Sequence, residues 1–183
     1  MDHLAALRLA ADYNAWVNAR LYDACASLSP ADYRADLGAF FRSVHGTLNH
    51  LLLGDRLWLG RIQGRAAEFT RLDTEICADL EALRAQRRAT DQAIADAVRS
   101  LAQADLDRPL RYVSILTGQP MTLPLWVAWM HLFNHQIHHR GQLTALLTRL
   151  GVDYGDIDLV WMPGVAMVGE AAATDGPPRG AGP

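Results

Sequence analysis

Residues 123–151 of the chain read LPLWVAWMHLFNHQIHHRGQLTALLTRLG. Pro124 suits the first turn of a helix and Gly151 is typical of a helix end, so the stretch predicts one helix of about 27 residues, roughly 40 Å long. Four of the chain's seven histidines fall on it, between residues 131 and 139. A helix of this length needs long partners to cover its apolar side, which indicates a bundle of helices.

Three other segments repeat apolar residues at helical spacing, over residues 2–28, 39–60 and 73–101. After the last of them, residues 110–123 alternate, contain β-branched side chains and include a turn around Gly118, which predicts a short β-hairpin. We therefore predict an all-α fold, a four-helix bundle with a short β-hairpin between its third and fourth helices.

The end of the chain differs in composition from the rest. We expect residues 1–168 to form a single domain, in which residues 152–168 add an irregular extension to the bundle. Residues 169–183 read GEAAATDGPPRGAGP, a composition that cannot bury enough apolar surface to fold, so they predict a disordered tail.

The overall composition argues against several classes of protein. The net charge is −3 and the basic residues, all arginine, are spread along the chain, so we expect no binding of nucleic acid or anionic lipid. The longest apolar run, residues 123–130, is far shorter than the ~20 residues of a membrane-spanning helix. Cys25 and Cys77 lack metal or redox spacing and predict buried, reduced thiols. With no secretory pattern at the N-terminus, we expect a cytoplasmic protein.

The histidines of residues 131–139 are spaced for metal binding. On a helix, residues three or four apart face the same side with Cβ atoms about 5–6 Å apart. His135 makes such a pair with His131, His138 and His139. Two imidazoles at this spacing can bind one Zn²⁺ through bonds of about 2.0–2.1 Å. An isolated pair is more often a surface or core feature, but apolar neighbours predict a largely buried helix here, where a metal ion would satisfy several imidazoles together.

A third ligand has to come from another helix, and residues 39–60 offer His45 and His50. These two are five residues apart, about 140° around a helix, so both cannot face the same site. His50 lies among leucines, whereas His45 falls near the expected helix start beside Gly46. We predict His50 as the third ligand and His45 as a neighbour of the site that reaches solvent.

Residues around the histidines indicate what kind of metal site to expect. Gln136 stands where helical zinc proteases carry a glutamate, and a carboxamide cannot act as a general base, so a metalloprotease is disfavoured. Gln142 could accept a hydrogen bond from a ligand ring. We expect Asp55 to pair with Arg140 across the helix interface, and Trp58 to belong to the core, like Trp129.

Two runs, SVHGTLNHLLLGDRLWL at residues 43–59 and FNHQIHHRGQL at residues 133–143, together resemble the DinB/YfiT superfamily of small four-helix metalloproteins. The resemblance covers roughly residues 4–162. It implies a divalent metal ion, zinc first and nickel as the alternative, and a homodimer. The ligands that it implies are His50, His135 and His139. It implies that His131 and His138 line the pocket without binding the ion.

Three neutral imidazoles leave coordination positions open for water or substrate, as catalytic zinc sites do. Relatives that use low-molecular-weight thiols imply a metal-dependent enzyme, a thiol-dependent S-transferase or a hydrolase, acting on a small molecule. The sequence names no catalytic residue. The alternative is a non-catalytic, stress-related metal-binding module, which a fourth ligand from His131, His138 or Asp55 would favour.

Overall fold

The structure, a computed structural model, describes residues 2–166. This part of the chain is mostly helical, with five α-helices and one small antiparallel sheet. The helices are α1 (His3–Cys25), α2 (Pro30–Arg34), α3 (Val44–Ile62), α4 (Leu80–Arg99) and α5 (Leu125–Arg149). The strands are β1 (Pro109–Val113) and β2 (Pro120–Pro124), and short 3₁₀ turns cover Gln103–Asp105 and Leu159–Trp161.

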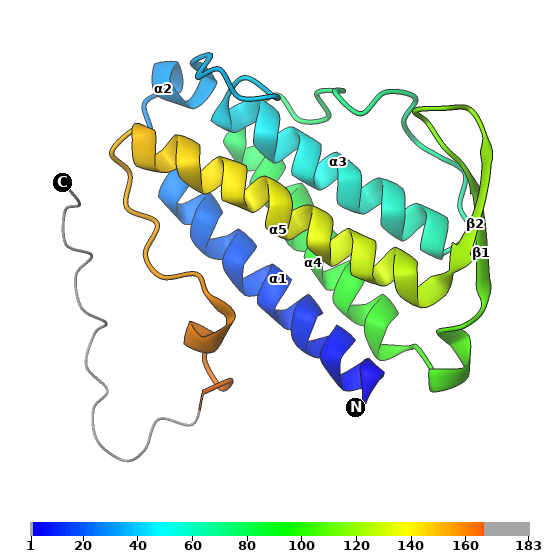
Figure 1. The fold of residues 1–183 in the computed structure, drawn as a ribbon. Coiled ribbons are helices and arrows are strands. Elements are labelled where there is room, and N and C mark those ends of the chain that lie inside the picture. The colour runs from blue at the N-terminus through cyan, green and yellow to red at the C-terminus, as the bar shows by residue number, and fades with distance from the viewer. Residues whose placement is uncertain (1, 167–183) are drawn as a thin grey trace.

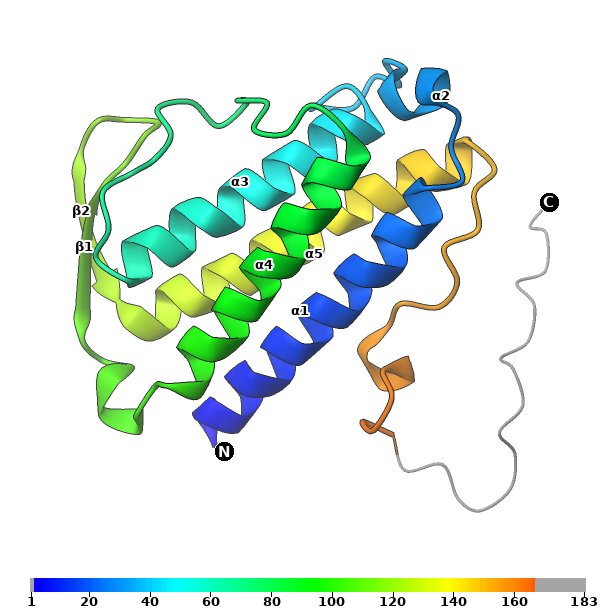
Figure 2. The same ribbon diagram turned by 180° about the vertical axis from the view of Figure 1, so that it is seen from behind.

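The four long helices lie side by side, as Figures 1 and 2 show from opposite directions. Both α1 and α3 contact α4 and α5, and α2 lies against α3. Two groups of buried apolar side chains fill the interior, one around Trp129 and one around Leu52 and Leu143. Each fully buried leucine stabilises the fold by about 1.5–3 kcal/mol, so these contacts fix how α3 and α5 face each other.

The hairpin predicted over residues 110–123 is present between α4 and α5. In its register Leu110 stands opposite Leu123. Leu110 is buried and packs with the Trp129 group, so the hairpin covers one end of the interior. Gly118 in the turn has φ 67°, a left-handed conformation that glycine adopts without strain.

Two helices begin later than the sequence predicts. Helix α3 starts at Val44 rather than residue 39, because Ser43 caps it by accepting a hydrogen bond from the Gly46 amide and residues 39–42 form a turn instead. Helix α4 starts at Leu80 rather than residue 73, with Asp79 as its cap. Residues 63–79 form a loop that leads from α3 to α4, and this loop contributes to the candidate site.

A buried charge network joins α3 and α4. Arg87 of α4 lies 2.8 Å from Asp55 of α3 and 2.8 Å from Asp91 of its own helix. The expected pair of Asp55 with Arg140 is wrong: Arg140 instead donates to the side-chain oxygen of Asn14, at 3.1 Å. The prediction failed because the sequence did not indicate that Arg87, which is only 3% exposed, would be the partner of Asp55.

The described residues bear on two further expectations. Among them, none of the helices combines the length and the hydropathy of a bilayer-spanning segment. Cys25 and Cys77 are both buried free thiols, as predicted. The extension expected at residues 152–168 is described as far as residue 166 and is irregular apart from the turn Leu159–Trp161, whereas the tail expected at residues 169–183 lies outside the described residues.

Candidate metal centre

Three imidazoles converge between helices α3 and α5. His50 comes from α3, and His135 and His139 lie one turn apart on α5. The Nε2 atom of His50 lies 3.1 Å from Nε2 of His135 and 3.1 Å from Nε2 of His139. A ligand atom of each ring lies within 4.8 Å of the other two, so the three form a group that could hold a metal ion.

The spacing of these nitrogens fits one transition-metal ion. Two nitrogens bound at 2.0–2.1 Å to a tetrahedral ion lie about 3.3–3.4 Å apart, close to the 3.1 Å between the rings here. All three donors are imidazoles, the ligand type that suits zinc, nickel and copper better than magnesium or calcium. The three imidazoles therefore fit a divalent ion of intermediate softness, such as zinc or nickel, better than a hard ion such as magnesium or calcium.

The outer nitrogens of two rings are fixed by hydrogen bonds. Nδ1 of His50 donates to the carbonyl oxygen of Leu72, at 2.9 Å, and Nδ1 of His139 donates to Oε1 of Gln142, at 2.8 Å. A neutral imidazole protonated at Nδ1 carries a lone pair on Nε2. Both lone pairs then point into the space between the rings, where they repel each other unless a proton or a cation lies between them. This is the arrangement in which an outer partner orients a metal-binding histidine.

The three rings are held in the neutral form that binds metal. Burial lowers the pKa of His50 to about 4, only partly opposed by its hydrogen bond to Leu72. Burial and the neighbouring rings lower the pKa of His135 to about 3, and burial also lowers the pKa of His139. Neutral imidazoles have no proton to release at pH 7, so an ion would bind there without competition from protons.

The other histidines of α5 lie outside this group. His131 is exposed, with its ring 4.4 Å from the ring of Trp58 and 5.8 Å from the ring of His135. His138 is also exposed and lies edge-on to His139, with 4.6 Å between ring centres. Gln142 stands where the sequence placed it, against a ring of the group.

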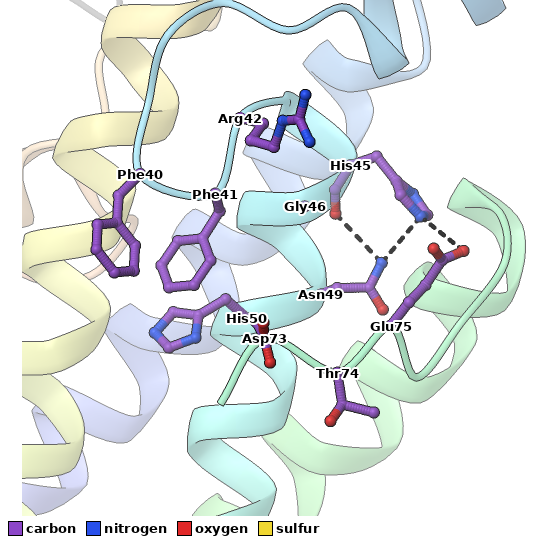
Figure 3. Close-up of a pocket in the computed structure, with 10 residues that line it drawn as sticks. All are labelled: Phe40, Phe41, Arg42, His45, Gly46, Asn49, His50, Asp73, Thr74 and Glu75. Carbon is purple, nitrogen blue, oxygen red and sulfur yellow. Dashed lines mark hydrogen bonds and ion pairs between the residues drawn. The ribbon is translucent and has the colours of Figure 1, made fainter. Parts of the chain in front are cut away.

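His45 is less exposed than the sequence predicts. It is 5% exposed rather than solvent-facing, because residues of the loop 63–79 cover the start of α3. Its Nδ1 lies 3.1 Å from the hydroxyl of Tyr33, and its Nε2 lies 3.1 Å from a carboxylate oxygen of Glu75 and 3.2 Å from the amide of Asn49. Figure 3 shows His45 and His50 pointing to opposite sides of α3, as their spacing predicts.

Two contributors to the site were missed by the sequence reasoning. The ring of Phe41 stacks on His50, with centres 3.8 Å apart and planes at 17°, and lies edge-on to His139 at 5.5 Å. Aromatic residues at positions 40 and 41 were visible, but they had been assigned to a helix face. The carbonyl of Leu72 carries no side-chain signal, so no pattern in the sequence could have indicated it.

A pocket of about 270 Å³ adjoins the group of histidines (Figure 3). His50 lines it together with Phe41, and its other walls come from the start of α3 and from residues 73–75 of the loop. Its charged groups are Arg42, Asp73 and Glu75. The pocket therefore offers both apolar and charged contacts beside His50.

Three comparisons with known proteins all find similarity to DinB proteins. The DinB family model matches residues 2–174. Protein DinB of Bacillus subtilis (strain 168) is 24% identical over 159 residues, which cover 79% of this chain and 88% of that protein. The crystal structure of a DinB-like protein from Bacillus cereus ATCC 10987 has a similar fold, with a TM-score of 0.59 and 19% identity over 76% of this chain and 89% of that chain. Because the family model spans nearly the whole sequence, the chain belongs to the DinB family.

Proposed function

We propose that His50, His135 and His139 bind one divalent metal ion, zinc first and nickel as the alternative, and that the protein is a metal-dependent enzyme of thiol-dependent S-transferase or hydrolase type. One observation carries the proposal: the Nε2 atoms of three imidazoles converge on one space, and among the described residues no fourth histidine, cysteine or carboxylate joins them. Three protein ligands with an open position are typical of catalytic rather than structural sites.

An ion in this position would lower the pKa of a water or thiol in its open position to near neutrality. The residues of the chain provide the setting for that chemistry. Leu72 and Gln142 keep the lone pairs of two ligands aimed inward, and the ring of Phe41 shields the His50 side from water. His131 and His138 flank the group from exposed positions and are available to a substrate rather than to the ion.

The adjoining pocket supports a small-molecule substrate. Its volume of about 270 Å³ lies just below the usual range for small-ligand sites, about 300–1,000 Å³, which suits a compact ligand. One arginine and two carboxylates among its lining residues suit a compact molecule that carries charges of both signs. A low-molecular-weight thiol built on an amino acid has this character, so we favour a thiol as the substrate or co-substrate.

The remaining expectations form part of the same proposal. The contacts of α1 and α3 with α4 and α5 support a four-helix-bundle architecture. Free buried cysteines are compatible with a reducing cytoplasm. Exposed apolar side chains on α5, such as Trp126 and Ile137, support a homodimer. The acidic balance supports a protein that does not bind nucleic acid.

Metal analysis tests the site without knowledge of the substrate. We expect protein purified with zinc supplied to hold close to one equivalent, His135→Ala to hold less than a tenth of that, and His138→Ala to match wild type. His138 is the matched control because it is the exposed neighbour of a ligand on the same helix. Wild-type protein that binds neither zinc nor nickel would remove the proposal.

Activity and stability separate the two candidate functions. Metal-loaded protein is incubated with thiols and electrophiles, and with ester and amide substrates, and His135→Ala serves as the blank. Turnover that disappears in the variant supports the enzyme. A non-catalytic stress-related module, the second candidate, would show no turnover but a large fall in melting temperature on chelation, since an ion bound to the folded state alone stabilises it.

A further inference from the structure

Helix α3 carries a glycine on each side of His50, at Gly46 and Gly54. Each lies four residues from the histidine, so all three fall within an arc of about 80° and a length of about 12 Å on one face of the helix. Neither glycine has a positive φ, so the backbone conformation does not require one. Glycine weakens a helix interior relative to alanine, and these two positions therefore need another explanation.

Gly54 lies against the ring of His135. A Cβ atom at this position would stand 2.7 Å from Cε1 and 3.1 Å from Nδ1 of that ring, well inside the 3.5–4.0 Å or so of an ordinary carbon contact. The ring has little room to retreat, because His50 lies 3.1 Å from its Nε2 and the ring centre of His139 is 4.4 Å away. The missing side chain of Gly54 thus leaves the space that His135 fills.

Gly46 does the same for the turn that carries Phe41. A Cβ atom at Gly46 would overlap the carbonyl oxygen of Phe41 and lie 3.3 Å from its carbonyl carbon. These are backbone atoms, so the whole turn would have to move. The ring of Phe41 stacks on His50 at 3.8 Å, and the close approach at Gly46 is what brings it there.

Other helical glycines show no such contact. Gly60, on the same helix and buried, and Gly141, on α5, each have nothing within 4 Å of the place where a Cβ atom would be. The close contacts are therefore confined, among the glycines within the described helices, to the two that flank His50.

We propose that Gly46 and Gly54 are positioning residues of the metal site: two notches on one face of α3, one admitting Phe41 and the other admitting His135, so that both reach His50. The proposal deepens the proposed function and rests on it for the role of the ion. The contacts themselves can be tested in metal-free protein.

The first experiment is a double-mutant cycle in chelator, read out as the melting temperature. Gly54→Ala should lower it when His135 is present. In the His135→Ala background the ring is gone, and the same change should raise it by about 2–4 °C through helix propensity. Gly60→Ala, the control, should raise it in both backgrounds. If Gly54→Ala behaves like Gly60→Ala in both backgrounds, the notch is not needed and the proposal fails. The double variant keeps this test decisive even if Gly54→Ala alone does not fold.

The second experiment measures zinc affinity by competition with a chromophoric chelator. Gly54→Ala should bind at least about tenfold more weakly than wild type, as displaced ligands or their supports do, and Gly60→Ala should be unchanged. Wild-type affinity in Gly54→Ala overturns the positioning role while the proposed function stands. Absence of zinc binding in wild type overturns the proposed function. The first experiment then still tests whether Gly54 makes room for the ring of His135.

The role of Gly46 in positioning Phe41 is tested separately, by measuring the rate at which excess chelator removes zinc from the protein. Gly46→Ala and Phe41→Ala should both accelerate release severalfold, because the first displaces and the second removes the ring that covers His50. Unchanged release from Gly46→Ala, with acceleration in Phe41→Ala, would overturn this half of the proposal.

Discussion

Nδ1 of His50 lies 2.9 Å from the carbonyl oxygen of Leu72, which belongs to the loop between α3 and α4. A carbonyl only accepts, so this contact fixes the proton on Nδ1 and the lone pair on the inner nitrogen. The loop is held in turn by Asn49, whose side-chain oxygen accepts from the amides of Ile76, at 2.9 Å, and Cys77, at 3.0 Å. The residue next to the proposed ligand thus anchors the segment that orients that ligand.

Replacing Asn49 should loosen both the loop and the site. Asn49→Ala removes the acceptor of two loop amides, and we expect zinc affinity to fall about 10–100-fold and the amides of Ile76 and Cys77 to exchange hydrogen faster. Asn134→Ala, an exposed asparagine on α5, is the control and should change neither. Faster exchange with unaltered affinity would show that His50 does not depend on this loop.

Gln142 should tune the proposed metal site through His139. Its Oε1 accepts from Nδ1 of the ring, so Gln142→Ala should weaken zinc binding about tenfold. Gln142→Glu should strengthen it, because a carboxylate acceptor makes the ring a stronger base. Isothermal titration of the two variants beside wild type gives the order directly. Equal affinities for Ala and Glu at this position would contradict the role.

The buried ion pairs predict a large stability effect. Arg87→Met leaves Asp55 and Asp91 in the interior without their cation, which should cost about 3–5 kcal/mol of unfolding free energy. Urea denaturation measures it. Arg88→Met, one position along on the exposed face, should cost less than about 0.5 kcal/mol. A small effect at Arg87 would contradict the expected contribution of these ion pairs to stability.

Acid should destabilise the metal-free protein through the three rings. The pKa values of His50 and His135 are about 4 and about 3, below the ordinary 6.5, so below pH 6.5 the unfolded chain binds protons that the folded chain does not. Their contribution to stability is complete above pH 6.5 and is lost as pH falls toward 4. Urea midpoints in chelator at pH 7.5, 6 and 5 should fall more steeply for wild type than for the double variant His50→Ala, His135→Ala. If the urea midpoints of wild type and the double variant fell equally with pH, the acid sensitivity would not come from these histidines.

The two thiols should be unreactive while the protein is folded. Burial raises the pKa of Cys25 to about 12, and also raises the pKa of Cys77, so almost no thiolate is present at pH 8. A disulfide reagent should therefore react slowly with native protein and rapidly with two equivalents in guanidinium chloride. Fast reaction of one thiol under native conditions would show that the loop around Cys77 opens.

Most of the fold could be predicted from apolar spacing, because long helices with a continuous apolar face give a strong periodic pattern. The starts of α3 and α4 were placed too early. Phe40, Phe41 and Ile76 continue the apolar spacing, yet Ser43 and Asp79 cap the helices after them, and the aromatic and loop residues pack on α3 from outside. Local spacing does not distinguish a residue within a helix from one that folds back onto it.

The parts of the candidate site that depend on the spacing of residues within one helix could be predicted from the sequence. The four-residue interval brought His135 and His139 to one side of α5, and the leucines around His50 indicated its burial; the structure brings these three together. The burial of His45 could not be predicted, because Tyr33 and Glu75, which contact it, come from segments outside its helix. The burial of Arg87 could not be predicted for a similar reason, since its buried partners Asp55 and Asp91 lie on two helices.

The separation of the histidines along the chain has a consequence for synthesis in the cell. His50 and His135 are 85 residues apart, and α5 is the last long helix among the described residues. A nascent polypeptide leaving the ribosome cannot assemble the trio until translation has passed His139 and the final helix has emerged. Loading with a metal ion would accordingly follow the emergence of α5, and a bound ion would indicate that α3 and α5 had packed together in the newly made chain.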